Sequence, residues 1–227
     1  MTVDDLARAV LELKPAAGTF VVGLTGSVAS GKSTLAAELA PRLGAEVVGT
    51  DGFLLPTAVL VERNLIHRKG FPESYDLAAM AAALAAVRQG PADFPAYSHV
   101  TFDPIPGRRL DRPSALLIEG LALGLSRPSI ADGIDCLIYL DAAETELETW
   151  FVDRFLTFWE AAEHDPASFY QRFRQLDRHG VTEVARQVWA GINLLNLRDH
   201  IAPVRPFADL VVVKGPDHAI VEIRARP

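Results

Sequence analysis

The feature that most constrains this chain is a glycine-rich loop set between an apolar run and a helical pattern. Residues 26–33 read Gly-Ser-Val-Ala-Ser-Gly-Lys-Ser, after the apolar residues 19–24 and before the alanine- and leucine-rich residues 34–40. This is the complete spacing of a phosphate-binding P-loop, in which backbone N–H groups and a helix N-terminus face a polyphosphate. A chance glycine turn is the alternative, and the flanking pattern disfavours it. The sequence therefore predicts a nucleoside triphosphate site.

Each position of the loop has an expected part in that site. Lys32 is placed to reach the outer phosphates and act as a catalytic group, and the Ser33 hydroxyl is placed to ligate Mg²⁺. We expect the whole loop to contact the nucleotide, through Gly26, Ser27, Val28, Ala29, Ser30, Gly31, Lys32, Ser33 and Thr34.

Composition limits the partners of this site. The formal net charge is −7 over 227 residues, which argues against nucleic acid as the main partner because binding to a phosphate backbone needs clustered Lys and Arg. Cys136 is the only cysteine and lies in an apolar run, so the sequence predicts a buried strand residue and no intrachain disulfide. The acidic first residues lack the apolar region of a secretory signal, and no stretch is apolar for long enough to span a membrane, so we expect a cytoplasmic protein.

The rest of the chain alternates apolar strands with helical patterns. This alternation predicts an α/β fold of the P-loop NTPase kind, with a mostly parallel sheet, helices on both faces and a single domain over residues 1–227, although two small domains fit the length. The expected strands are 19–24, 46–49, 115–120, 135–140, 209–213 and 219–223, and the expected helices are 3–14, 32–43, 76–88, 143–160 and 182–197.

Two stretches do not follow this alternation. Residues 54–75 read as irregular chain, and the proline-punctuated residues 91–113 predict an elaborated hairpin or lid. We expect residues 1–17 to form a lead-in helix and 54–113 to form an insertion over the acceptor site.

Two carboxylates follow short apolar strands. Because ligands bind at the carboxyl ends of strands in such sheets, Asp51 and Glu119 are expected to face the phosphates. We assign Asp51 as the base that takes the proton of an acceptor hydroxyl, and place Glu119 near Mg²⁺. The alternatives are a turn or helix-capping role for Asp51 and an ion pair between the strand-end carboxylate of Glu119 and a nearby arginine.

Several segments together resemble the bacterial type I pantothenate kinase family, within the wider group of uridine kinase and phosphoribulokinase. They occur in order from about residue 18 to the end, at 26–34, 50–54, 69–76, 97–99, 118–121, 154–156, 165–166, 192–197 and 208–224. The resemblance implies an ATP- and Mg²⁺-dependent kinase that acts on the primary hydroxyl of pantothenate, in the first step of coenzyme A biosynthesis. It also implies a homodimer.

The resemblance implies an acceptor pocket as well. The positions that match the family's pantothenate-binding residues are Tyr97, His99, Arg154, Phe155, Phe158 and Asn193. Arginine can pair with a carboxylate, while Asn, Tyr and His can hold amide and hydroxyl groups. Structural alternatives stay open for this set: Arg154 could stack on aromatic rings, Asn193 could link helices, and the aromatic residues of 150–159 could belong to the core.

Four departures from the family pattern affect acceptor choice and control. Phe102 and Phe151 stand where tyrosines are common, Ala122 replaces an asparagine, and Ala37 replaces an arginine associated with coenzyme A feedback. We expect a short form without the family's N-terminal extension and only weak inhibition by coenzyme A.

A nucleoside or sugar-like alcohol is the alternative acceptor. A non-kinase ATPase or regulatory homologue is a further alternative, while a GTPase is disfavoured because the chain has no Asn-Lys-x-Asp motif.

Overall fold

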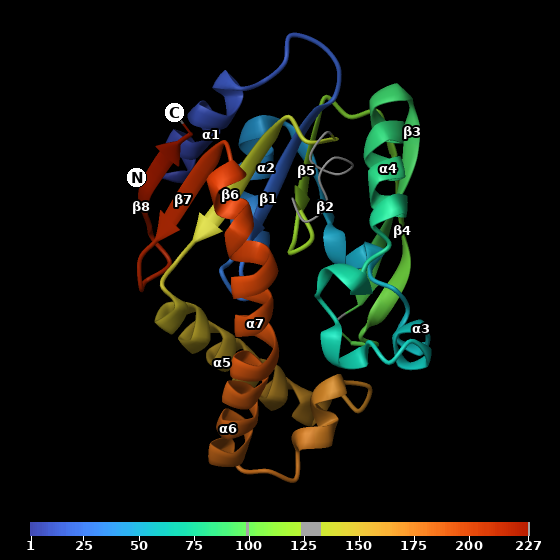
Figure 1. Ribbon diagram of the computed structural model, residues 1–227, viewed down its shortest axis with the longest axis vertical. Helices are drawn as coiled ribbons and strands as arrows, with labels where there is room; N and C mark the ends of the chain where they lie inside the picture. Colours follow the sequence, from blue (N-terminus) through green and yellow to red (C-terminus); the bar gives the residue numbers. More distant parts are fainter. Residues whose placement is uncertain (99, 124–132, 227) are drawn as a thin grey trace.

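The computed structural model describes residues 1–98, 100–123 and 133–226, and is built around one six-stranded sheet (Figure 1). The strand order is β2-β5-β1-β6-β7-β8, and every neighbouring pair is parallel except β7 and β8. The strands are β1 (Phe20–Gly26), β2 (Ala45–Gly49), β5 (Ala115–Glu119), β6 (Cys136–Asp141), β7 (Leu210–Lys214) and β8 (Ile220–Ala225). The mostly parallel α/β fold expected from the sequence is confirmed.

The central strands are apolar throughout because both of their faces are covered. On β1, Phe20, Val22 and Leu24 belong to one buried cluster, while Val21 belongs to the other. Successive side chains of a strand point to opposite faces, so a strand covered on both sides reads as a continuous apolar run. Cys136 is fully buried on β6, as expected, and burial raises the pKa of its thiol to about 12.

Helices α1 (Val3–Glu12) and α2 (Lys32–Leu43) cover one face of the sheet (Figure 1). Thr2 and Asp5 form a capping box at the start of α1, which satisfies backbone N–H groups at the helix N-terminus. Leu6 and Val10 of α1 and Leu39 of α2 are fully buried against the sheet. This packing holds α2 directly behind the P-loop.

The opposite face is covered by α4 (Leu77–Gln89) and by α5 (Glu144–Ala161), which projects below the sheet and packs on α6 (Arg178–Val188) (Figure 1). Asp76 caps α4 by accepting a 2.9 Å hydrogen bond from the N–H of Ala79. Trp150 and Phe155 of α5 are buried in this core, which agrees with the core alternative for these aromatic residues.

The strands β3 (Pro91–Ser98) and β4 (Asp103–Asp111) pair as an antiparallel hairpin, as the proline-punctuated sequence predicts. Arg108 ties β4 to the edge of the main sheet, through hydrogen bonds of 2.7 Å to Glu46 Oε2 and 2.7 Å to the carbonyl oxygen of Val47. A Cβ atom on Gly52 would lie 2.2 Å from the carbonyl oxygen of Pro95 on β3, so only glycine allows this close approach. The hairpin therefore packs directly on the segment that carries Asp51.

Two sequence expectations were wrong in detail. Residues 54–75 are not irregular throughout, because they contain helix α3 (Thr57–Glu62) and two short 3₁₀ turns, Ile66–Arg68 and Pro72–Ser74. The helix expected over 182–197 begins earlier, at Arg178, because Asp177 caps it by accepting a 2.8 Å hydrogen bond from the N–H of Gly180. Beyond Val188 the chain continues in wider π-type turns around α7 (Leu194–Asn196).

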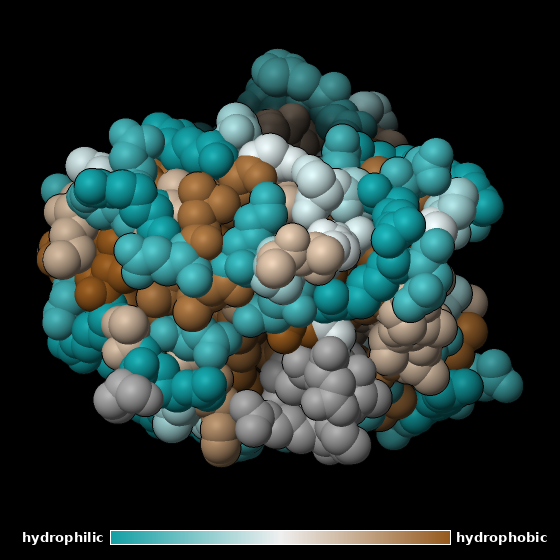
Figure 2. Space-filling view, turned by 90° about the horizontal axis from the view of Figure 1, so that it is seen from above, coloured by the Kyte–Doolittle hydropathy of each residue, from teal (hydrophilic) through white to brown (hydrophobic). Residues whose placement is uncertain are grey.

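Seen from above, polar side chains cover most of the visible surface, with apolar groups between them (Figure 2). Among the residues that the structure describes, no helix is both long and apolar enough to cross a bilayer.

Candidate active site

The P-loop connects β1 to α2 in the conformation that the sequence predicts. Gly31, the residue before α2, has a φ of 86°, in the left-handed region that favours glycine. The Nζ atom of Lys32 donates a 2.7 Å hydrogen bond to the carbonyl oxygen of Ser27, so the lysine folds back over the loop. The backbone of the loop and the N-terminus of α2 together form a ready anion site.

Lys32 is buried, with 8% of its surface exposed. Burial lowers the pKa of its ammonium group to about 8, and the nearby carboxylates of Glu119 and Asp51 oppose this shift. An anionic ligand at the loop would favour the charged ammonium and so offset the effect of burial on Lys32. The buried ammonium of Lys32 therefore favours the binding of phosphates at the loop.

A cavity of about 580 Å³ opens beside the loop. Its lining brings together three groups expected at the site: the P-loop, the strand ends that carry Asp51 and Glu119, and the acceptor-side residues Tyr97 and Arg154. The hairpin contributes one wall, and the described lining residues include Val28, Ala29, Lys32, Ser33, Asp51, Gly52, Pro95, Tyr97, Arg108, Glu119, Leu121 and Arg154.

The two expected Mg²⁺ ligands lie side by side. The Ser33 hydroxyl donates a 2.8 Å hydrogen bond to Oε1 of Glu119, at the end of β5. Hydroxyl and carboxylate oxygens are the donors that Mg²⁺ prefers, usually together with waters and substrate phosphates. Within the described part of the chain, the hydroxyl oxygens of Ser27 and Ser30 are also buried without a protein partner. This donor set fits a metal-bound triphosphate.

Asp51 lies in a 3₁₀ turn, Thr50–Phe53, directly after β2. It faces the cavity across from the P-loop, and its Oδ1 atom accepts a 3.1 Å hydrogen bond from the hydroxyl of Tyr75. The carboxyl end of β2 thus brings a carboxylate to the same edge of the sheet as the P-loop, as expected for a doubly wound fold. The geometry suits a proton acceptor within reach of a hydroxyl held in the cavity.

Arg154 comes from α5 and faces the cavity from below the sheet. Its side chain keeps an exposed surface that lines the cavity. The protein packed around the guanidinium removes water from it and lowers its pKa, while Tyr170, Asp51 and Glu119 oppose that shift. Tyr97 on β3 is half-buried in the same cavity, and burial raises the pKa of its phenol. A cation and a phenolic hydroxyl therefore line the acceptor side of the cavity.

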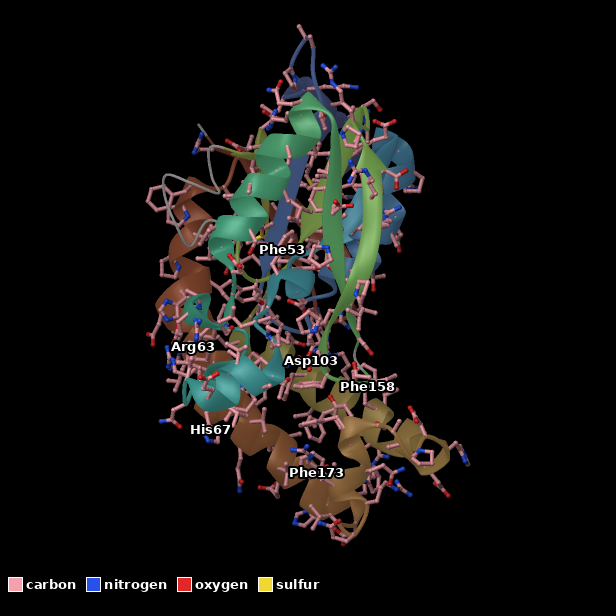
Figure 3. The ribbon with its side chains drawn as sticks, turned by 90° about the vertical axis from the view of Figure 1, so that its right-hand side faces the viewer. Phe53, Arg63, His67, Asp103, Phe158 and Phe173 are labelled. Carbon is pink, nitrogen blue, oxygen red and sulfur yellow. The ribbon has the colours of Figure 1, made fainter. Side chains whose placement is uncertain are left out.

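An aromatic cluster joins the tip of the hairpin to the lower helices. The ring of Phe102 stacks on Phe169 at a centroid distance of 4.4 Å and meets Tyr97 edge-on at 6.0 Å. Tyr170 packs on Phe155 at 5.0 Å and on Phe158 at 5.4 Å. Figure 3 shows Asp103, at the lower end of the hairpin, lying above Phe158 and Phe173.

Some expected site residues lie elsewhere. Phe155 and Phe158 belong to this aromatic cluster and are not among the described residues that line the cavity, and the same holds for Asn193, which is half-buried in a π-type turn. The asparagine that is fixed in the core is Asn196, which donates a 2.8 Å hydrogen bond to the carbonyl oxygen of Gly70. His99 lies outside the described residues.

Sequence reasoning missed three side chains near the site. Tyr75 bonds to Asp51, and Tyr170 lies near Arg154. Lys69 lies 4.5 Å from the ring centre of Phe102 and donates a 3.0 Å hydrogen bond to Thr57 Oγ1. The segment 69–76 carried a signal, because it is part of the family resemblance, but its spacing alone does not show which side chain reaches Asp51.

Comparisons with known proteins agree with this geometry. Residues 21–150 match the phosphoribulokinase / uridine kinase family. A protein named pantothenate kinase from Rhizobium johnstonii is 43% identical in an alignment that covers 91% of this chain and 69% of the relative. A second protein of that name, from Brucella ovis, is 40% identical, and its alignment covers 91% of this chain and 70% of the relative. A solved structure from Silicibacter, attributed to a fructose transport system kinase, superposes with a TM-score of 0.73 at 28% identity, covering 87% of this chain and 93% of that one.

Proposed function

The chain belongs to the phosphoribulokinase / uridine kinase family and is an ATP-dependent small-molecule kinase, and we propose that its acceptor is pantothenate. The observation that carries this proposal is the shared cavity, in which Asp51, Tyr97 and Arg154 face the P-loop residues Lys32 and Ser33. The relatives named pantothenate kinase, at 40–43% identity over 91% of the chain, support it.

In the proposed reaction the acceptor's primary hydroxyl lies between Asp51 and the γ-phosphate. Asp51 takes the hydroxyl proton while a new bond forms from the acceptor oxygen to the γ-phosphorus and the bond to the β-phosphate oxygen breaks, leaving ADP. Lys32 and the loop N–H groups neutralise negative charge on the transferred group. The products are the phosphorylated acceptor, ADP and one proton.

We propose that Ser33 and Glu119 hold Mg²⁺ at this site, since their oxygens lie 2.8 Å apart beside the P-loop. When bound, the ion would neutralise phosphate charge.

On the acceptor side, Arg154 suits the carboxylate of pantothenate because a guanidinium can pair with a carboxylate through two hydrogen bonds. Tyr97 supplies a hydroxyl to the same side of the cavity.

We propose that the enzyme acts in the cytoplasm, where ATP is supplied. We also propose that it is a homodimer, which sedimentation velocity would test directly.

A sugar-like alcohol is the second candidate acceptor. The structural relative from Silicibacter, attributed to a fructose transport system kinase, matches over 93% of its own length at a TM-score of 0.73. Phe102 and Phe151 also lack the two hydroxyl groups common in the pantothenate kinases that the sequence resembles.

The decisive experiment measures ATP-dependent phosphorylation over a panel of pantothenate, pantetheine, fructose, glycerate and uridine. We expect the highest kcat/KM with pantothenate, and loss of at least about a hundredfold in kcat for Asp51→Asn, because the variant lacks a proton acceptor. ATP binding by this variant is expected to stay near that of the parent. Preference for another acceptor would reject pantothenate, and full turnover by the variant would remove Asp51 from the mechanism.

A further inference from the structure

The segment 69–76 is part of the family resemblance but has no role in the reaction described above. Its second half runs beside the 3₁₀ turn that carries Asp51. There the hydroxyl of Tyr75 donates a 3.1 Å hydrogen bond to Oδ1 of Asp51. This contact joins a side chain of unassigned role to the proposed base.

Backbone hydrogen bonds hold Tyr75 in register with the Asp51 segment. The N–H of Leu55 donates to the carbonyl oxygen of Ser74 at 2.8 Å, and the N–H of Asp76 donates to that of Phe53 at 2.8 Å. Leu54 and Tyr75 form an antiparallel bridge between these two bonds. These bonds hold the backbone of Tyr75 beside the segment that carries Asp51.

A second set of contacts anchors the segment from behind. The buried Ser74 hydroxyl accepts a 2.9 Å hydrogen bond from the N–H of Gly70 and donates a 2.7 Å hydrogen bond to the carbonyl oxygen of Phe71. Phe71 is 2% exposed, and Asn196 holds the Gly70 carbonyl at 2.8 Å. These buried hydrogen bonds hold the segment before Tyr75 against the core.

The phenol is also a permanent donor. Tyr75 is 6% exposed, and burial together with the neighbouring Asp51 raises the pKa of its hydroxyl well above the ordinary value. The hydroxyl therefore stays protonated near neutral pH, and it donates a hydrogen bond to the Asp51 carboxylate without taking the acceptor's proton.

We propose that Tyr75 is a positioning residue that binds Oδ1 of Asp51 and so directs Oδ2 toward the acceptor hydroxyl. The inference rests on the proposed role of Asp51 as the base. A carboxylate with one oxygen held by a fixed donor loses rotational freedom before the acceptor arrives, which is the advantage of a preorganised site.

The first test is kinetic. Tyr75→Phe keeps the buried ring and removes only the hydroxyl, so we expect a native melting profile, an unchanged KM for ATP and a fall in kcat of about ten- to a hundredfold, typical of a lost hydrogen bond to a charged group. Tyr139→Phe, which removes the hydroxyl of another buried tyrosine in the same core cluster, is the matched control and should retain the parent kcat. A kcat for Tyr75→Phe equal to that of the control would reject the proposal.

The second test needs no acceptor, so it separates this inference from the choice of pantothenate. The carboxyl carbon of Asp51, assigned by its absence in Asp51→Asn, is followed by ¹³C NMR in the enzyme without acceptor at one fixed neutral pH. Loss of the hydrogen bond from the phenol should change the chemical shift of this carbon in Tyr75→Phe and leave it in place in Tyr139→Phe. Identical chemical shifts in the parent and Tyr75→Phe would overturn the proposal whichever acceptor the enzyme uses.

Discussion

At the scale of single residues, Lys32 shows how burial prepares a side chain for its ligand. Its ammonium is buried beside the carbonyl oxygen of Ser27, and burial lowers the pKa of this group to about 8. The triphosphate would place several negative charges next to this group, which favours the charged form. Nucleotide binding and protonation of Lys32 should therefore be linked.

This linkage gives a pH-dependent prediction. Below the lowered pKa Lys32 already carries its proton, whereas about one pH unit above it most molecules have lost the proton and must regain it when the phosphates bind. We expect proton uptake on ATP binding to be small at about pH 6.5 and to approach one proton near about pH 9. Isothermal titration calorimetry in buffers of different ionisation enthalpy measures this uptake.

The control for this measurement is Lys32→Arg, because a guanidinium stays charged over the whole range and should take up no proton. Equal uptake by the parent and this variant would assign the proton to another group. No uptake by the parent at the higher pH would show that Lys32 is already charged in the free site.

At the scale of elements, the hairpin of β3 and β4 is attached at both ends. Arg108 ties β4 to the edge strand β2, and at the tip Phe102 stacks on Phe169 of the segment after α5. Phe102 has a φ of 58°, so the tip backbone adopts a conformation uncommon for a side-chain-bearing residue. The stacking contact helps to hold the wall of the cavity that carries Tyr97.

We predict that this contact contributes to acceptor binding and not to nucleotide binding. Phe102→Ala and Phe169→Ala should each raise the KM for the acceptor about two- to tenfold, as expected for an aromatic pair worth about 0.5–1.5 kcal/mol, and leave the KM for ATP unchanged. The double variant should show less than the product of the two single effects, because the rings act on each other. Independent effects in this double-mutant cycle would show that the stack does not position the wall.

At the scale of the whole molecule, a hydrogen-bond network that joins a helix to the sheet lies at the opposite end of the sheet from the candidate active site. At the amino end of β1, Arg88 of α4 donates hydrogen bonds of 3.2 Å to the carbonyl oxygen of Thr19, 2.9 Å to that of Gly133 and 3.0 Å to Asp135 Oδ2. Asp135 in turn accepts a 2.8 Å hydrogen bond from the N–H of Val21. This network fastens a helix of one layer to the central strands.

Removing this fastening should lower stability without changing the chemistry. For Arg88→Met we expect a loss of about 1–3 kcal/mol in the free energy of unfolding, because partly buried acceptors lose their donor. The KM for ATP should stay at the parent value. Urea denaturation and steady-state kinetics measure the two quantities.

The matched control is Arg109→Met, whose partner is Asp93 at 2.9 Å on the exposed face of the hairpin. Exposed ion pairs contribute little, so its stability should stay within about 0.5 kcal/mol of the parent. Equal losses for the two variants would show that the Arg88 network has no special part in joining the layers.

The predictions that succeeded from sequence depended on local patterns. Glycine spacing, followed by Lys32 and Ser33, specified the P-loop because phosphate binding there is carried mainly by consecutive backbone groups. Apolar runs such as residues 115–118 predicted strands that are covered on both faces. The order of the strands in the sheet could not be predicted from these local patterns. Helix starts were less well predicted, since Asp177 caps α6 and the helix begins at Arg178, four residues before the predicted start.

By itself, the sequence determined the α/β class, the nucleotide loop and the position of Asp51 just beyond a strand. The tertiary structure alone decided which distant side chains meet there. Tyr75 reaches Asp51 across 24 residues of chain, a contact that the sequence did not predict. Such contacts depend on how whole elements pack, and no local spacing encodes that packing. For the same reason, Asn193 and Asn196 look alike in the sequence, although only Asn196 is fixed against the segment that positions Tyr75.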